Sequence, residues 1–223
     1  MITIDAIRVR DGERTLLDGV TMLLTANAVH GIAGEGRSTL LRTVYGLLKP
    51  ESGHISAHGH PLRQRDMAYL EAEPHFWPGL TAGDYLDLVR RYTPGADPAP
   101  FLRRLPVTPD TEAADTEAAA MSPAEQKRLA LVLALMRRKQ VLLLDEPFRG
   151  LDIESVFVLQ QLILQLGSEG RTLLVAVDSL TPLDGICDDL YVLGDGGVRS
   201  RYEHYEFARA AREAGLAPGF PEK

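Results

Sequence analysis

A glycine-rich stretch between an apolar run and a helical pattern has the residue types needed to bind phosphate. Residues 31–39 read GIAGEGRST, one residue away from the P-loop pattern G-x-x-x-x-G-K-[ST], because Arg37 stands at the lysine position. Glycines let the backbone curl so that successive N–H groups point at a polyphosphate. The helix that follows would present the positive end of its dipole to the same anion. The predicted phosphate-binding residues are Gly31, Gly34, Gly36, Arg37, Ser38 and Thr39.

Three side chains decide what this loop could do. Ser38 would place its hydroxyl on a magnesium ion. Arg37 offers positive charge, although its guanidinium is a planar fork where a slim ammonium is expected. Glu35 is expected to add a negative charge inside the loop, beside the phosphates. The loop alone leaves two interpretations open, nucleotide binding and a glycine-rich turn without a ligand.

An acidic pair follows a second apolar run further along the chain. Residues 141–144 read VLLL, as in a strand buried in a parallel sheet, and Asp145 and Glu146 come directly after it. Ligands of open α/β sheets bind at this carboxyl end of the strands. Asp145 could help hold magnesium, and Glu146 could polarise an attacking water. An acidic pair here could also be a simple loop cap, but together with the P-loop it favours a nucleotide site.

The elements that must position these residues follow from hydrophobic periodicity and turn signals. Ser122, Pro123 and Glu125 have the spacing of an N-cap, N1 and N3, which predicts the start of a helix. Because strands alternate with helices after the P-loop, we expect a mainly parallel sheet, with antiparallel strands near the N-terminus. The predicted strands are 2–10, 16–24, 29–32, 54–57, 67–70, 141–144, 172–177 and 190–193. The predicted helices run from the P-loop to 49–50, over 81–92, near 101–105, from 122, over 153–166 (ended by Gly167), near 181 and over 205–214.

Bulk composition narrows the classes of function. The 223 residues carry a net charge of −7, which does not suggest a nucleic-acid-binding surface. The single cysteine, Cys187, fits a reducing compartment. No run approaches the ~20 apolar residues that span a bilayer, and the first ten residues lack the pattern of a signal peptide. We therefore expect a soluble intracellular chain, so that any membrane role would come through a partner.

The order of these segments resembles the nucleotide-binding subunit of ATP-binding cassette (ABC) transporters over essentially the whole chain. The P-loop and LLRTVYGLLKPESGHI are similar to the first third of that family. YLEAEPHFWPGLT stands at the Q-loop, MSPAEQKRLALVLAL at the signature helix, VLLLDEP at Walker B, FRGLD at the D-loop and LLVAVDSL at the switch segment. The matches are collinear, and their conjunction is more specific than any one motif.

The resemblance implies a fold and a division of the chain. We expect an α/β P-loop NTPase of ABC ATPase type, with a mainly parallel core sheet, N-terminal antiparallel strands and a small helical insert. Residues 1–223 would form one domain. Residues 1–71 and 140–223 would be the nucleotide-binding core, and 72–139 a helical subdomain that carries the signature-like helix.

Several family positions hold other residues here. The substitutions, in chain order, are Arg10 and Asp11 near the adenine-stacking aromatic, Arg37 for the Walker A lysine, Ala72 for the Q-loop glutamine, Pro123 and Ala124 for the signature glycines, and Val177 for the switch histidine. Retained are Ser38, Thr39, Ser122, Asp145, Glu146, Gly150 and Asp152. Losing one positioned polar group typically costs about 10²–10³ in rate. We therefore expect hydrolysis to be weak or absent.

The resemblance also implies ligands and partners. ATP would be bound by the P-loop residues of one subunit and Ser122 of the facing one, with Mg²⁺ held by Ser38 and Asp145 and Glu146 in the catalytic role. The partners would be a membrane-spanning subunit and a second nucleotide-binding subunit, identical or different. The chain would be cytoplasmic, peripheral on the inner face of the cell membrane. Phe76 and Trp77 lie in the segment that resembles the docking groove. A non-catalytic scaffold that binds no nucleotide remains the alternative.

Overall fold

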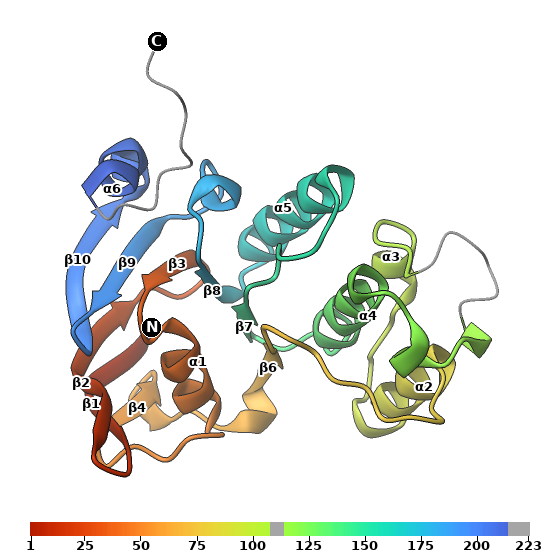
Figure 1. The fold of residues 1–223 in the computed structure, drawn as a ribbon, viewed down its shortest axis with the longest axis horizontal. Helices are drawn as coiled ribbons and strands as arrows, with labels where there is room; N and C mark the ends of the chain where they lie inside the picture. Colours follow the sequence, from red (N-terminus) through yellow and green to blue (C-terminus); the bar gives the residue numbers. More distant parts are fainter. Residues whose placement is uncertain (108–113, 214–223) are drawn as a thin grey trace.

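The computed structural model describes residues 1–107 and 114–213. These residues form two sheets and six α-helices, with the sheets on one side and α2, α3 and α4 on the other (Figure 1). The strands are β1 (Ile2–Asp11), β2 (Arg14–Leu24), β3 (Val29–Gly34), β4 (Ser52–Ala57), β5 (His60–Pro61), β6 (Met67–Leu70), β7 (Val141–Asp145), β8 (Thr172–Val177), β9 (Asp189–Gly194) and β10 (Gly197–Glu203). The helices are α1 (Arg37–Tyr45), α2 (Ala82–Tyr92), α3 (Ala99–Leu102), α4 (Pro123–Leu135), α5 (Ile153–Ser168) and α6 (Phe207–Glu213).

The larger sheet has the order β10-β9-β3-β8-β7-β6. Its pairings from β9 to β6 are parallel, and β10 joins the edge antiparallel to β9. The smaller sheet, β2-β1-β4-β5, is antiparallel. The predicted α/β fold, with a mainly parallel core and N-terminal antiparallel strands, is confirmed.

The larger sheet is covered on both faces, which explains its uninterrupted apolar strands. Leu143 packs with α1 and the smaller sheet in one core, and its neighbours Leu142 and Leu144 pack in the second core with α4 and α5. Side chains alternate between the two faces of a strand.

The one cysteine, Cys187, is 5% exposed in the second core, and burial raises its thiol pKa well above the ordinary value.

Two predicted helix ends are wrong, and one strand was missed. The helix after the P-loop ends at Tyr45 rather than near Pro50, because Gly46 takes the left-handed conformation (φ 86°) and caps it. Helix α5 continues through Gly167 to Ser168, and the left-handed glycine beyond its end is Gly170. Strand β10 was not predicted. The predicted helix over 205–214 is observed as α6, and residue 214 lies outside the described residues.

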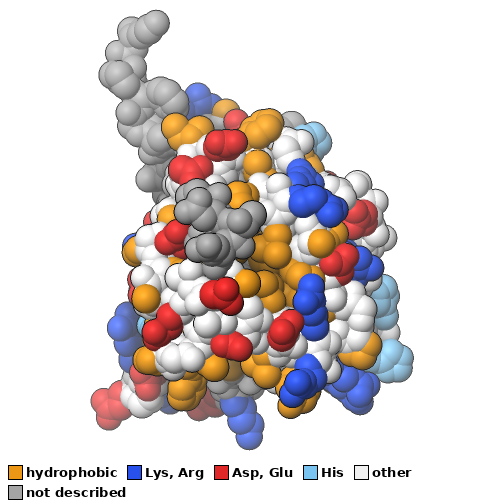
Figure 2. Space-filling model, turned by 90° about the vertical axis from the view of Figure 1, so that its right-hand side faces the viewer, with side chains coloured by type: hydrophobic (Ala, Val, Ile, Leu, Met, Phe, Trp, Pro, Cys, Tyr) orange, Lys and Arg blue, Asp and Glu red, His pale blue; other side chains and the backbone are white. Residues whose placement is uncertain are grey.

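Residues 72–107 and 114–139, which we call the helical segment, contain α2, α3 and α4 and none of the named strands. The starts predicted for α2 and α4 are confirmed, since Thr81 and Ser122 cap these helices, and in the structure each forms a capping box. The segment faces the viewer in Figure 2, where hydrophobic side chains gather near the middle and basic side chains follow the right-hand side. The division of the chain into a core and a helical subdomain stays a prediction. None of the described helices has the length and apolar character needed to cross a membrane.

Candidate nucleotide site

The glycine loop joins β3 to α1 and follows a path that only glycine can take at two positions. Gly34 and Gly36 have φ values of 91° and 92°, a conformation that side-chain-bearing residues rarely adopt. A Cβ atom at Gly34 would lie 2.1 Å from the carbonyl oxygen of Leu193 in β9. The backbone at the start of α1 therefore has the close, curled geometry that suits a phosphate group.

Ser38 and Asp145, the two predicted magnesium ligands, are in contact. The hydroxyl of Ser38 donates a hydrogen bond to Oδ1 of Asp145 over 2.9 Å, and the hydroxyl of Tyr69 donates to Oδ2 over 3.4 Å. Asp145 is fully buried at the end of β7. Burial raises its pKa, and the Ser38 hydrogen bond and the charges of Arg37 and Arg42 oppose that rise. A hydroxyl and a carboxylate oxygen are donors that suit Mg²⁺.

The guanidinium of Arg37 contacts the glycine loop and also forms an ion pair with Glu146. Its Nε and Nη2 lie 2.8 and 2.6 Å from Oε1 of Glu146, and its Nη1 donates to the carbonyl oxygen of Gly34 over 3.1 Å. The carboxylate side chain is 5% exposed and the guanidinium side chain 25% exposed. The cation predicted to contact phosphate and the carboxylate predicted to polarise water thus neutralise each other.

Glu146 is fixed by backbone contacts as well. It has a φ of 47°, which is uncommon for a residue with a side chain. Its N–H donates to the carbonyl oxygen of Ala176 at the end of β8 over 2.9 Å. Burial raises the pKa of Glu146, the hydrogen bond from Arg37 opposes the rise, and the nearby charge of Asp178 adds to it. The end of β8 and Arg37 together set the position of this carboxylate.

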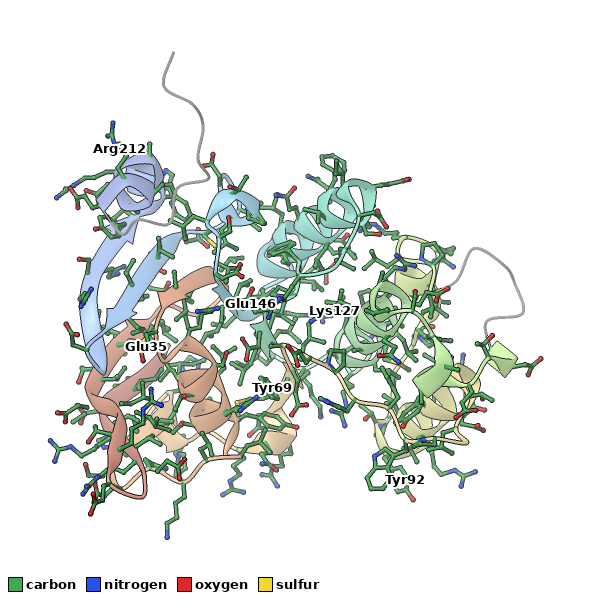
Figure 3. All side chains as sticks on the ribbon, in the orientation of Figure 1. Glu35, Tyr69, Tyr92, Lys127, Glu146 and Arg212 are labelled. Atoms are coloured by element: carbon green, nitrogen blue, oxygen red, sulfur yellow. The ribbon has the colours of Figure 1, made fainter. Side chains whose placement is uncertain are left out.

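A buried lysine from the helical segment reaches the same place. Lys127 in α4 is 4% exposed, and its ammonium donates hydrogen bonds to the carbonyl oxygens of Ala72 and, over 3.2 Å, Glu146. Burial lowers its pKa from 10.5 to about 8, although the charges of Asp145 and Glu146 oppose that shift. Figure 3 shows Lys127 and Glu146 near each other between α4 and the core. Lys127 therefore links the signature-like helix to both the Q-loop position and Walker B.

Other predicted positions are placed as follows. The Ser122 hydroxyl donates to Oε2 of Glu125 over 2.6 Å and caps α4. Thr39, in the first turn of α1, accepts a hydrogen bond at its carbonyl oxygen from the Thr43 hydroxyl. The prediction for Glu35 is wrong. Its side chain is 82% exposed and pairs with Arg14 over 3.6 Å, so its charge faces solvent rather than the inside of the loop.

Sequence reasoning missed four neighbours of the acidic pair, namely Arg42, Tyr69, Lys127 and Asp178. Asp178 directly follows the predicted strand 172–177, so the rule that places ligands at strand ends could have found it. The other three lie on elements far apart in the sequence, and only the packing of α1 and β6 against β7, and of α4 against β6, brings them together.

Comparison with known proteins agrees with this geometry. The family model of the ABC transporter family matches residues 17–149. The thiamine import ATP-binding protein ThiQ of Jannaschia sp. (strain CCS1) is 33% identical over 208 residues, which cover 89% of this chain and 91% of that protein. The cytochrome c biogenesis ATP-binding export protein CcmA of Gluconobacter oxydans (strain 621H) is 29% identical over 187 residues, covering 82% and 84%.

Solved structures show the same fold. An ATP-binding subunit of an ABC transporter has a TM-score of 0.80 at 23% identity, covering 97% of this chain and 94% of that one. A dimeric ATP-binding cassette in a post-hydrolysis state with ADP and Pi has a TM-score of 0.81 at 22% identity, covering 92% and 99%. With the family model matched over more than half of its length, this chain belongs to the ABC transporter family and has the fold of its ATP-binding subunits.

Proposed function

We propose that this chain is the ATP-binding subunit of an ABC transporter that docks on a membrane-spanning partner and binds Mg-ATP, with weak or absent hydrolysis. The observation that carries the proposal is the contact between Ser38 and Asp145 beside the glycine loop, next to the ion pair of Arg37 with Glu146. The first contact keeps the parts of a phosphate and magnesium site together. The second contact pairs Arg37 with Glu146, two residues that turnover would need to be free.

The residues present fit the nucleotide. Gly34 and Gly36 keep Cβ atoms out of the loop, and α1 presents its N-terminus there. Ser38 and Asp145 would hold Mg²⁺ between the loop and β7. Bound Mg-ATP would supply a terminal phosphoryl group that can be transferred to water.

Turnover is expected to be weak because the groups that would orient and activate water are missing or engaged. Glu146 would have to release Arg37 before it could accept a proton. Ala72 and Val177 have no polar side-chain atom, and Pro123 has no backbone N–H to offer a phosphate. In a homodimer each ATP site would lack residues from both subunits. In a heterodimer one site would contain this chain's substituted Walker A loop and the other its substituted signature helix, so neither site would be complete.

A groove beside the Q-loop position supports docking on a partner. It has a volume of about 260 Å³ and lies between the end of β6, residues 74–76, α2 and α4. Phe76 packs edge-on against Tyr85 with ring centroids 5.0 Å apart, whereas Trp77 is 75% exposed. A large exposed aromatic beside an apolar groove is typical of an interaction surface. Whether the transporter would import or export is left open.

The scaffold alternative is favoured by one specific observation. Arg37 satisfies Glu146 within the chain, so the loop needs no phosphate to balance its cation. A regulator of this kind would keep the fold and the partner but bind no nucleotide.

Calorimetry of Mg-ATP binding to the purified chain separates the two candidates. We expect a dissociation constant in the micromolar to millimolar range, a binding free energy of roughly 4–8 kcal/mol. Ser38→Ala and Asp145→Ala should abolish it, because each removes a magnesium ligand. Ser168→Ala, at the end of α5, is the matched control and should bind like the parent. Absence of binding in the folded parent chain would support the scaffold instead.

A further inference from the structure

A polar cavity lies between the helical segment and the core, away from the glycine loop. It has a volume of about 510 Å³ and is walled by α3 on one side and α5 on the other. Arg138 and Arg171 in its lining precede the first residues of β7 and β8. The cavity is therefore at the amino ends of these parallel strands, whereas the P-loop is at the carboxyl end of β3.

Arginines dominate the charge of this cavity. Arg103, Arg104, Arg138 and Arg171 line it, and among the described lining residues Glu169 is the one acid. Its carboxylate is 3.7 Å from Arg171, and Asp97 is 3.9 Å from Arg138. The whole chain carries a net charge of −7, so a cavity lined by four guanidinium groups has the opposite sign of charge from the chain as a whole.

Two of these arginines have unused donors. Arg171 is 14% exposed, and its Nη1 is buried without a hydrogen-bond partner among the described residues. Buried polar groups are normally hydrogen-bonded. The guanidinium of Arg103 forms no ion pair or side-chain hydrogen bond in the part of the chain that the structure describes. Burial lowers the pKa of Arg171, the charge of Glu169 opposes that shift, and the neighbouring charge of Arg138 adds to it.

We propose that this cavity binds a small phosphorylated molecule. Guanidinium groups match the oxygens of phosphate with paired, charge-assisted hydrogen bonds, and four of them from two walls suit more than one phosphate oxygen. The volume is that of a small-molecule pocket, and Phe101 and Leu162 add an apolar surface for a carbon skeleton. The inference is independent of ATP binding at the P-loop.

Binding here would join two parts of the fold. Arg103 and Arg104 follow α3 in the helical segment, whereas Arg171 follows α5 and leads into β8 of the core. An anion between them would replace repulsion across the cavity by attraction to both walls. Occupancy would therefore favour the arrangement in which α3 and α5 lie close together.

Pyrophosphate is the probe for the test, by calorimetry at about 0.15 M salt, where long-range charge effects are screened. The Ser38→Ala variant should keep one pyrophosphate site, because the P-loop is not the site in question. Arg103→Gln/Arg138→Gln should weaken that site at least tenfold while near-UV circular dichroism stays unchanged. Arg104→Gln alone, an exposed change, should weaken it as well.

The matched control is Arg90→Gln/Arg199→Gln, which removes the same charge from arginines that are 53% and 59% exposed on α2 and β10. It should bind pyrophosphate like the parent. Loss of all binding in Ser38→Ala, or equal weakening in the control pair, would overturn the proposal. Binding of an acidic peptide without binding of pyrophosphate would also overturn it, because the ligand would then be a protein segment.

Discussion

The ion pair between Arg37 and Glu146 keeps apart two groups that nucleotide chemistry would use separately. A guanidinium bound to a buried carboxylate has less charge to offer a phosphate, and the carboxylate itself repels one. We therefore expect Glu146→Gln to bind Mg-ATP about tenfold more tightly, a gain of about 1.4 kcal/mol. Calorimetry on the variant and the parent measures this difference.

Glu73→Gln is the control for that experiment. Glu73 is 77% exposed and lies 3.9 Å from Arg149, so its replacement removes the same charge without freeing Arg37. An unchanged affinity in Glu146→Gln, or the same gain in Glu73→Gln, would show that the ion pair does not limit binding.

Lys127 should give stability a pH dependence of its own. Below about pH 8 the ammonium is charged in the folded and the unfolded chain. Between about pH 8 and 10.5 the folded chain has already lost the proton that the unfolded chain still binds, so the free energy of unfolding rises with pH. The total rise attributable to this group is about 3 kcal/mol, at ~1.4 kcal/mol per pKa unit.

Urea unfolding at roughly pH 7.5, 9 and 10.5 tests whether the free energy of unfolding rises with pH. The Lys127→Met variant should lack this rise relative to the parent, and Lys49→Met, which removes an exposed lysine, should keep it. A parent chain and a Lys127→Met variant with parallel pH profiles would contradict the assignment.

Helix starts could be predicted here more accurately than helix ends. The boxes that begin at Thr81 and Ser122 are local, since an N-cap and the residue at N3 bond each other within one turn. The ends depend on which glycine takes the left-handed conformation. Gly46 and Gly170 do so while Gly167 stays helical with its backbone close to Val29.

Ser122→Ala should therefore destabilise α4 by about 1 kcal/mol, the usual cost of losing an N-cap. The loss would be measured as a lower urea midpoint with an unchanged slope. Ser168→Ala, at the last residue of α5, should have a much smaller effect. If both variants unfolded like the parent, the hydrogen bonds of Ser122 with Glu125 would contribute nothing to stability.

The site residues that directly follow a strand could be predicted from the sequence. The contacts between side chains of different elements could not. Ser38, Asp145 and Glu146 follow from the P-loop spacing and the strand-end rule. That Arg37 would pair with Glu146 depends on how α1 lies against β7, which no local pattern encodes. Lys127 stands beside Arg128 in α4, and no local pattern shows which of the two is buried. The partners of Lys127, Ala72 and Glu146, come from two other segments.

The molecule as a whole presents large apolar side chains at a distance from the nucleotide site. On the helical segment, Trp77, Leu88 and Tyr92 are 75%, 50% and 74% exposed, and Figure 3 shows Tyr92 at the outer edge of this segment. If the groove at residues 74–76 receives a partner, Trp77→Ala should weaken assembly with the membrane subunit, at a cost of about 2 kcal/mol as for an interface aromatic. The variant's own unfolding should be unchanged.

Co-purification with the membrane subunit is the measurement for Trp77→Ala. Phe157→Ala on α5 is the control, since it truncates another aromatic that is 60% exposed. Equal recovery of the complex with Trp77→Ala and with the parent chain would show that this aromatic takes no part in docking.

The burial of Cys187 makes the chain convenient for spectroscopy. It is the one cysteine in the sequence, and its thiol is shielded and poorly ionised, so thiol-reactive dyes should label it slowly. Cysteines introduced at exposed positions, such as Leu88→Cys on α2 and Phe157→Cys on α5, could then be labelled selectively without removing the natural one. Energy transfer between two such dyes would follow the separation of the helical segment and the core in solution as nucleotide or pyrophosphate is added.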